Sequence, residues 1–224
     1  MSREPRPLQE FDFPYPRDLV LPQVKEADFV WARENPDKWM YYVDPSADKS
    51  ALTNANVIGG RLANGEGEFV DRWINPEFVP TPQYAGVEFA NEFELVMWRT
   101  NSGFTNIGRF LDALARSRLT IVLRADDPDG QRGWPFRPDG DQLWLDVYTS
   151  AGMLPRDTNP WLRRDISGRD VLEQVSPMDR VHVFFNPPDK EPGLTLVGED
   201  LTYWWRQRQE GIRLAAEAER AEGP

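Results

Sequence analysis

The sequence predicts an α+β protein in which mixed and antiparallel sheets are flanked by helices. Three observations predict this class: apolar runs typical of strands, apolar residues at helical spacing behind capping residues, and turn motifs between them. The chain has 224 residues, 40% of them hydrophobic, including twelve Phe and nine Trp. That length suits one large domain or two small ones, and the aromatic residues are sufficient for a buried core.

Composition divides the chain into four segments. Residues 1–22 contain five prolines and are expected to form an extended arm. A small β-rich module is expected over residues 23–90, followed by an α+β module over residues 91–205. The polar stretch 206–224 is expected to hold the end of the last helix and a tail.

The N-terminal module is expected to contain a short helix followed by strands. The segment VKEADFVWARENP has apolar residues at helical spacing and ends in Asn-Pro, whereas the aromatic run WMYYVDP predicts a strand. Asn64-Gly65 lies between two partly apolar runs and predicts a hairpin with a type I′ turn, which needs positive φ at both central residues. Gly59-Gly60 indicates a bulge or a close approach of the backbone.

The second module is expected to combine capped helices with strands. Asn91 and Glu94 resemble a capping box at the start of one helix, and a second helix begins near Ile107 with an apolar face. Strands are expected over LTIVLRA, LWLDVYT and RVHVFFN. A short helix is expected from Ser167, and a long one from Glu199, whose charge suits the positive end of a helix dipole.

The stretch 126–149 is rich in Asp and contains two Pro-Asp-Gly triplets. A calcium-binding EF-hand loop is one interpretation, but aligning Gly130 with the loop glycine leaves Ala125 and Phe136 where acidic ligands are required. Turn chemistry is the better interpretation, because Pro fixes φ and Gly accepts a positive φ. We therefore expect two turns in a meander of three strands, LTIVLRA, GWPFR and LWLDVYT, and no metal site.

Charge and composition exclude several classes of protein. The 37 acidic and 26 basic residues leave a net charge of −11, which repels phosphate backbones and anionic lipid, so no nucleic-acid partner is expected. The absence of Cys excludes disulfides and thiolate chemistry. No segment approaches the roughly 18 apolar residues of a membrane span, and the first residues lack the apolar run of a signal peptide. We expect a cytoplasmic protein without membrane insertion.

No catalytic or cofactor-binding constellation is visible. The single histidine, His182, lies in a predicted strand and is expected to be a hydrogen-bonded sheet residue. Glu92 and Glu94 could act together as a general acid and base, although a solvated helix face is the more ordinary role for such acids. We expect no cofactor and no enzymatic activity.

Five aromatic residues are candidates for a partner-binding surface. They lie near predicted turns or side by side on the last helix: Trp134, Phe136, Trp161, Trp204 and Trp205. One interpretation is that they cover a small core. The other is an interface, because Trp and Tyr are common among the residues that dominate binding energy.

The order of elements in the second half is similar to the SseB family. The segments FLDALARSRLTIVLR, LWLDVYTS, ISGRDVLEQV and RVHVFFNPPDKEPGLTLVGEDL carry this likeness, with Tyr148-Thr149-Ser150 and Asn186-Pro187 at the ends of two strands. Where SseB-like chains have Asn-Pro-Gly, this chain has Asn-Pro-Pro. The first half resembles the N-terminal module of actinobacterial type VII secretion system-associated proteins, through WARENPDKWMYYVDP and GEFVDRWINPEFVPTPQYAGV.

These resemblances cover about residues 28–203 and imply an accessory protein encoded beside a type VII (ESX-type) secretion system. We therefore expect a non-catalytic protein-binding protein that handles a secreted substrate. An alternative is an immunity protein that neutralises a secreted toxin, since an acidic surface suits a basic toxin. A cofactor-free enzyme that works with carboxylates is a third and weaker alternative.

Overall fold

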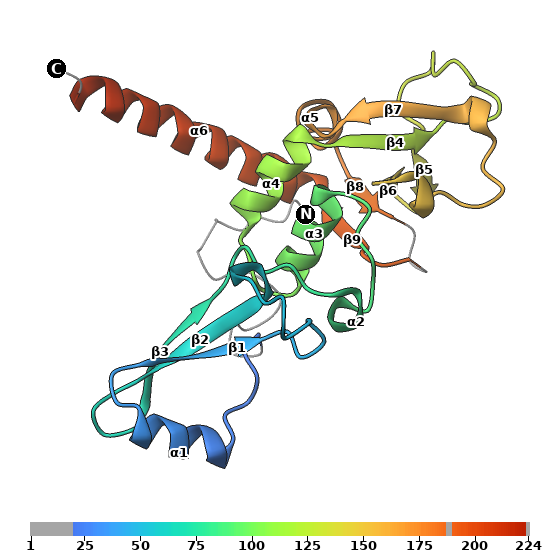
Figure 1. Cartoon of the computed structure of the whole chain (residues 1–224). Coiled ribbons are helices and arrows are strands. Elements are labelled where there is room, and N and C mark those ends of the chain that lie inside the picture. Colours follow the sequence, from blue (N-terminus) through green and yellow to red (C-terminus); the bar gives the residue numbers. More distant parts are fainter. Residues whose placement is uncertain (1–19, 187–189, 223–224) are drawn as a thin grey trace. The chain divides into compact units, whose positions relative to one another are not determined.

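The computed structural model describes residues 20–186 and 190–222. The expected arm over residues 1–22 therefore lies almost wholly outside the described residues. In the described part, helices accompany one antiparallel sheet, one two-stranded sheet and one mixed sheet (Figure 1). The predicted α+β class is confirmed. None of the helices in this part combines the length and apolar character needed to cross a bilayer.

The chain divides into two compact units, each described here by itself. Among the described residues, the N-terminal unit comprises 20–89 and 98–106, and the C-terminal unit comprises 90–97 and the residues from 107 onward. Residues 98–106 thus group with the N-terminal unit, although the sequence placed them in the second module.

The N-terminal unit is built on an antiparallel sheet of order β1-β2-β3. The expected helix, strand and hairpin are all present, as shown in Figure 1. The elements are α1 (Glu26–Glu34), β1 (Trp39–Val43), β2 (Val57–Ala63), β3 (Phe69–Ile74) and the single turn α2 (Pro82–Ala85).

The turn of the β2–β3 hairpin differs from the predicted type I′ turn. Asn64 and Glu68 close the loop through a backbone hydrogen bond of 2.8 Å, and the Asn64 side-chain oxygen accepts from the N–H groups of Glu66 and Glu68. The positive φ falls on Gly67, at 80°, and not on Gly65. The prediction of a two-residue turn was wrong because Asn64 bonds to backbone groups further along the loop, which lengthens it.

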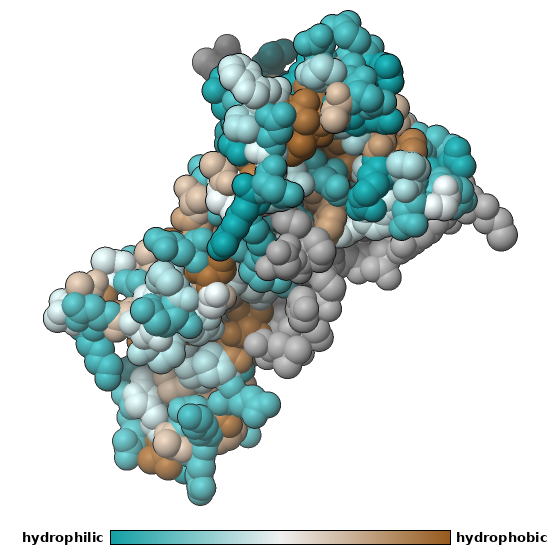
Figure 2. Space-filling view, turned by 90° about the vertical axis from the view of Figure 1, so that its right-hand side faces the viewer, coloured by the Kyte–Doolittle hydropathy of each residue, from teal (hydrophilic) through white to brown (hydrophobic). Residues whose placement is uncertain are grey.

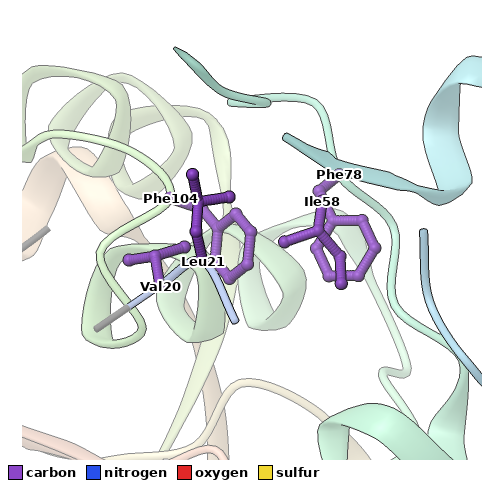
Figure 3. Packing of buried hydrophobic residues seen from close by; sticks show 5 residues of the cluster. All are labelled: Val20, Leu21, Ile58, Phe78 and Phe104. Carbon is purple, nitrogen blue, oxygen red and sulfur yellow. The ribbon is translucent and has the colours of Figure 1, made fainter. Parts of the chain in front are cut away.

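The core of the N-terminal unit gathers residues from distant parts of the sequence. Figure 3 shows five of them, Val20, Leu21, Ile58, Phe78 and Phe104, each less than 10% exposed. The rings of Phe78 and Phe104 are stacked with their centroids 4.9 Å apart. This cluster packs against one face of the sheet, because Tyr42 and Ile74 are in contact with it.

The C-terminal unit combines helices with two linked sheets. Its elements are α3 (Glu92–Asn101), which continues into the residues grouped with the other unit, α4 (Ile107–Arg116), β4 (Arg118–Val122), β5 (Arg137–Asp139), β6 (Gln142–Val147), β7 (Arg163–Ser167), α5 (Gly168–Asp170), β8 (Val181–Phe185), β9 (Leu194–Val197) and α6 (Gly198–Glu222). Strands β6 and β8 run parallel within a sheet of order β5-β6-β8-β9, while β4 pairs with β7.

The predicted meander is wrong in its pairing. Strand β4 pairs with β7, and a bridge between Thr120 and Tyr148 connects β4 to the end of β6. The expected middle strand GWPFR overlaps the short strand β5 only at Arg137, and β5 pairs with β6 across Gly140 and Asp141. The second Pro-Asp-Gly triplet therefore places Pro138 within a strand, and only its glycine lies in the turn. A prediction that pairs strands adjacent in sequence could not identify β7 as the partner of β4, because β7 follows about forty residues later along the chain.

Aromatic and branched residues fill the core of the C-terminal unit. Phe93 of α3, Phe110 of α4 and Phe185 of β8 form mutual ring contacts at 5.6–6.1 Å. The predicted apolar face of α4 is confirmed, since Ile107, Phe110, Leu111 and Leu114 are all buried. The helix therefore packs as its periodicity predicts.

Candidate functional site

The five aromatic residues predicted to bind a partner lie in different environments. Trp161 is 89% exposed at the centre of a 3₁₀ turn, whereas Trp134, Phe136 and Trp204 are half-buried. Trp205 is 7% exposed and belongs to the core, with the Arg169 guanidinium 5.9 Å from its ring centroid. Trp205 is therefore corrected to a core residue, because α6 turns this side chain towards the body of its unit.

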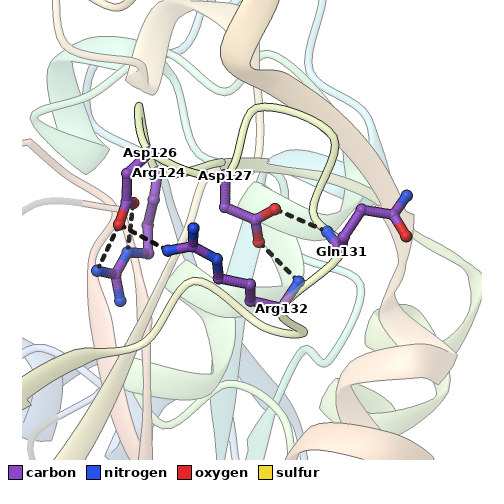
Figure 4. Close-up of polar contacts among 5 residues, drawn as sticks. All are labelled: Arg124, Asp126, Asp127, Gln131 and Arg132. Atoms are coloured by element: carbon purple, nitrogen blue, oxygen red, sulfur yellow. Dashed lines mark hydrogen bonds and ion pairs between the residues drawn. The ribbon is translucent and has the colours of Figure 1, made fainter.

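The acidic segment that begins at Asp126 forms a turn held by its own side chains (Figure 4). The two carboxylate oxygens of Asp127 accept hydrogen bonds from the backbone N–H groups of Gln131 and Arg132, both at 2.8 Å. Asp126 forms ion pairs with Arg124 and Arg132, each at 3.0 Å. Hydrogen bonds from the Arg124 side chain lower the pKa of the Asp126 carboxyl. The predicted turn chemistry at Pro128 is thus confirmed.

No metal-type cluster accompanies this loop. Within the described ranges, no group of three or more His, Asp or Glu side chains lies close enough together to hold an ion. The carboxylates of Asp126 and Asp127 instead bind protein donors.

Glu92 and Glu94 lie in different environments. Glu94 is fully buried, with Oε1 2.6 Å from the Thr149 hydroxyl and Oε2 accepting from the Ala90 N–H at 2.8 Å. Glu92 is exposed and lies 3.8 Å from Arg116. The two acids therefore have separate structural roles, and Glu94 caps α3 by bonding to the residue before Asn91.

The residues that carry the SseB-like resemblance form a hydrogen-bond network around Glu94. Asn186 has a φ of 60°, and its side-chain oxygen accepts from the Thr149 N–H at 3.0 Å. The Asn186 amide donates to the carbonyl of Pro192, and the Asn91 amide donates to the carbonyl of Thr149. The network ties the ends of β6 and β8 to the start of α3. It is a structural arrangement, since its members bond to one another.

His182 has the predicted role of a hydrogen-bonded sheet residue. Its Nε2 lies 2.8 Å from Gln142 Oε1, and its ring stacks on Trp144 with the centroids 4.7 Å apart. Arg137 lies over the other side of this arrangement, with its guanidinium carbon 5.8 Å from the Trp144 ring centroid. These side chains cover one another on a face of the mixed sheet.

The best candidate for a binding site is a groove on the three-stranded sheet of the N-terminal unit. Its volume is about 900 Å³, within the usual range for ligand sites. We define the aromatic groove by its aromatic and charged lining residues: Trp39 and Tyr41 of β1, Asp71, Arg72 and Trp73 of β3, and Glu77 beyond β3.

Strand register places four of these groove residues on one face. Tyr41 pairs with Gly60, and Gly60 pairs with Trp73. The neighbouring row contains Trp39 of β1 and Asp71 of β3, which both pair with Leu62 of β2. Because residues directly opposite one another, and residues two apart in one strand, share a face, these four side chains project together. Tyr42 and Ile74, in an alternate row, pack against the core described above.

Gly60 lies in β2 between Tyr41 of β1 and Trp73 of β3. A Cβ at Gly60 would lie 3.1 Å from a Tyr41 ring carbon and 3.2 Å from a Trp39 ring carbon, so the missing side chain lets the Tyr41 and Trp39 rings lie close to the sheet. Tyr41 and Trp73 meet across this position edge to face, with ring centroids 6.4 Å apart. They are nevertheless 57% and 41% exposed, which is unusual for paired aromatic residues.

Polar groups form the rim of the aromatic groove. Asn75 is buried and donates to the carbonyls of Asn54 and Val57, at 3.0 and 2.8 Å, which fixes the loop beside the groove. Its side-chain oxygen accepts from the Glu77 N–H at 3.0 Å. The Glu77 side chain is 60% exposed and lies 3.8 Å from the guanidinium of Arg99. The rim is thus held at its backbone by Asn75, and the Glu77 carboxylate there is paired with Arg99.

The groove presents exposed aromatic rings beside charged side chains, an arrangement that suits binding. Sequence reasoning assigned WMYYV to a strand but did not select its residues as a site, because both of its faces are apolar. The pair Gly59-Gly60 was the one indication, since it predicted a close approach at this position. Figure 2 shows one face of the molecule, on which hydrophilic residues predominate and hydrophobic ones form patches.

No family model matches the chain, and neither a curated protein nor a solved structure matches it.

Proposed function

We propose that the chain is a non-catalytic protein-binding accessory protein of type VII secretion, and that the aromatic groove is its binding surface. The observation that carries this proposal is the pair of exposed rings at Tyr41 and Trp73, held over Gly60 by strand register. Exposed Trp and Tyr side chains on a rigid sheet supply large contact area with little loss of side-chain entropy on binding.

The link to secretion rests on the sequence resemblance of the two halves. Thr149 and Asn186 belong to the motifs on which the SseB-like resemblance is based. Their hydrogen bonds to each other support this resemblance, because they give both residues a role in holding the fold. The engagement of Glu94 by protein donors supports binding over catalysis, since both oxygens of this candidate acid are already bonded.

Co-purification with the products of neighbouring genes tests the proposal. A tagged protein is co-expressed with each product, and the Tyr41→Ala/Trp73→Ala double variant is compared with the wild type. Loss of two central aromatic contacts weakens such interfaces by at least ~30-fold, so we expect the complex to disappear from the elution.

Trp161→Ala is the matched control, because this ring is 89% exposed in the C-terminal unit. Retention of the partner by Trp161→Ala and its loss from the double variant support the groove. The opposite pattern assigns binding to the predicted residue Trp161 and contradicts the groove.

The nature of the partner separates accessory and immunity roles. The net charge of −11 favours a basic partner, and a secreted basic toxin is one such protein. If the bound product inhibits growth when expressed alone and is harmless in the complex, the immunity role replaces the accessory role. A harmless secreted product supports handling of a substrate.

A further inference from the structure

The outer edge of β1 points backbone N–H and C=O groups away from its sheet. The Lys38 carbonyl accepts from the Ala63 N–H at 3.0 Å, so Lys38 faces β2. Because the backbone groups of successive residues point to opposite sides of a strand, those of Trp39, Tyr41 and Val43 point away from β2. Strand β1 is the first in the order of its sheet, and in the part of the chain that the structure describes no backbone hydrogen bond of a turn or loop reaches these three residues.

Val43 keeps this orientation despite the register irregularity between Tyr42 and Val43. The Asp44 N–H donates to the Asn56 carbonyl at 2.9 Å, so Asp44 faces inward and the residue before it faces outward. The side chains of Tyr41 and Val43 are 57% and 39% exposed. The edge is therefore accessible at its side chains as well as at its backbone.

The two edges of this sheet differ in how they are protected against another strand. Strand β3 contains Asp71 and Arg72, and the Arg72 N–H donates to Asp71 Oδ1 at 2.7 Å. Charged residues on an edge strand hinder the addition of a further strand, and so does a backbone donor that is already engaged. The sequence of β1, WMYYV, has no charged residue and no proline. Of the two edges, β1 is therefore the one that favours strand addition.

We infer that β1 pairs with β1 of a second copy of this chain, antiparallel about a two-fold axis at Tyr41. This register is self-complementary: Tyr41 lies opposite Tyr41 and Trp39 lies opposite Val43, so every outward-pointing residue of the strand meets an outward-pointing residue. The three side chains share one face of β1, and aromatic and β-branched cross-strand pairs stabilise a sheet. The inference goes beyond the proposed function and does not depend on it.

Sedimentation velocity measures the oligomeric state of the full chain over a range of concentrations. The five residues of β1 form a small contact, so we expect a dimer that dissociates on dilution. Salt should strengthen this dimer, because it screens the repulsion between two copies that each carry a net charge of −11. A protein that stays monomeric at every concentration, or a dimer that salt weakens, overturns the inference.

Single cysteines test the register, because the wild-type chain contains none. In the inferred pairing the two Cα atoms at position 41 lie about 5.5 Å apart, whereas those at position 43 are offset by about 13 Å along the strands. The reagent is dibromobimane, which joins two neighbouring thiols into a fluorescent product. We expect it to cross-link Tyr41→Cys and not Val43→Cys. Equal cross-linking of the two variants contradicts this register.

Lysine substitutions compare the two edges of the sheet directly. Val43→Lys places a charge on β1, and the matched control Val70→Lys places the same charge on β3, where Val70 is 58% exposed. We expect Val43→Lys to weaken the dimer about 10-fold, since two cross-strand pairs are lost in each dimer, and Val70→Lys to leave it unchanged. Both substituted side chains are exposed, so both variants should fold. Equal behaviour of the two variants overturns pairing at β1.

Co-purification with Val43→Lys separates a second copy from a strand of the natural partner. Retention of the partner by this variant, together with loss of the dimer, supports pairing of two copies at β1. If the wild-type chain is monomeric alone and Val43→Lys loses the partner, the β1 edge binds a strand of that partner and the inference is wrong. The proposed function stands in both cases, because it requires only that a partner co-purifies with the wild type.

Discussion

The acidic turn at residues 126–132 and the aromatic groove contrast in how they use their side chains. In the turn, residues that resemble ligands are bonded to local partners: both oxygens of Asp127 accept backbone N–H groups. In the groove, residues that resemble core are exposed: Tyr41 and Trp73 face outward across Gly60. A side chain's type thus indicates its chemistry, while the neighbours that the fold supplies decide whether that chemistry is available to a partner.

The largest effect is expected from Gly59→Ala, which disturbs the sheet that supports the groove. A Cβ at Gly59 would lie 2.3 Å from the Trp73 carbonyl oxygen and 2.8 Å from the Leu21 side chain. We expect the free energy of unfolding to fall by about 3 kcal/mol, because the strands must separate. Urea denaturation measures this, and a loss below ~1 kcal/mol would contradict the close packing described for β2 and β3.

Asp127→Ala is expected to have the next largest effect, and it examines the turn. The substitution leaves two backbone N–H groups, those of Gln131 and Arg132, without their acceptor. We expect a loss of about 2 kcal/mol in unfolding free energy. Asp127→Asn keeps one acceptor oxygen and should lose less. Equal stability of all three proteins would show that the carboxylate does not hold the turn.

Gly60→Ala tests the groove face of β2, next to the position tested by Gly59→Ala. Its Cβ would lie 3.0 Å from the Met40 carbonyl oxygen and 3.1–3.2 Å from ring carbons, so these neighbours have to move by only a few tenths of an ångström, less than at Gly59. The expected change in unfolding free energy is less than ~1 kcal/mol. Tryptophan emission should nevertheless change, because Trp39 and Tyr41 are displaced. A loss as large as that of Gly59→Ala would indicate that the groove rings are packed as tightly as a core.

The smallest effect is expected from Asp126→Asn. Asp126 is exposed, and its pairs with Arg124 and Arg132 are open to solvent. Surface ion pairs of this kind contribute little to stability. The denaturation curve should therefore overlay that of the wild type. A clear shift of the midpoint would mean that the two arginines depend on this carboxylate for their positions.

Local patterns predicted much of the fold. The apolar face of α4, from Ile107 to Leu114, follows from spacing alone, because one helix face must be buried. The Pro128 turn likewise follows from the φ preference of Pro. In both cases the decisive contacts lie within a few residues of sequence.

Features that depend on distant contacts were not predicted. The partner of β4 is β7, and a local pattern cannot reveal which strand arrives from further along the chain. The groove was missed for a similar reason: Met40 and Tyr41 are both apolar enough for a core, and only the packing of Tyr42 with Ile58 and Phe78 decides which face is covered.

Helix α6 consists of two parts that respond to different conditions. Leu201 and Trp205 anchor its first turns, and Arg208 pairs with Asp112 of α4 at 2.6 Å. Further along, Arg213 pairs with Glu217 at 2.6 Å while nearly every residue faces solvent. Salt weakens such surface pairs but hardly affects burial. Raising the ionic strength should therefore reduce the helical circular dichroism of the distal part, while the near-ultraviolet signal of the buried aromatic residues stays constant.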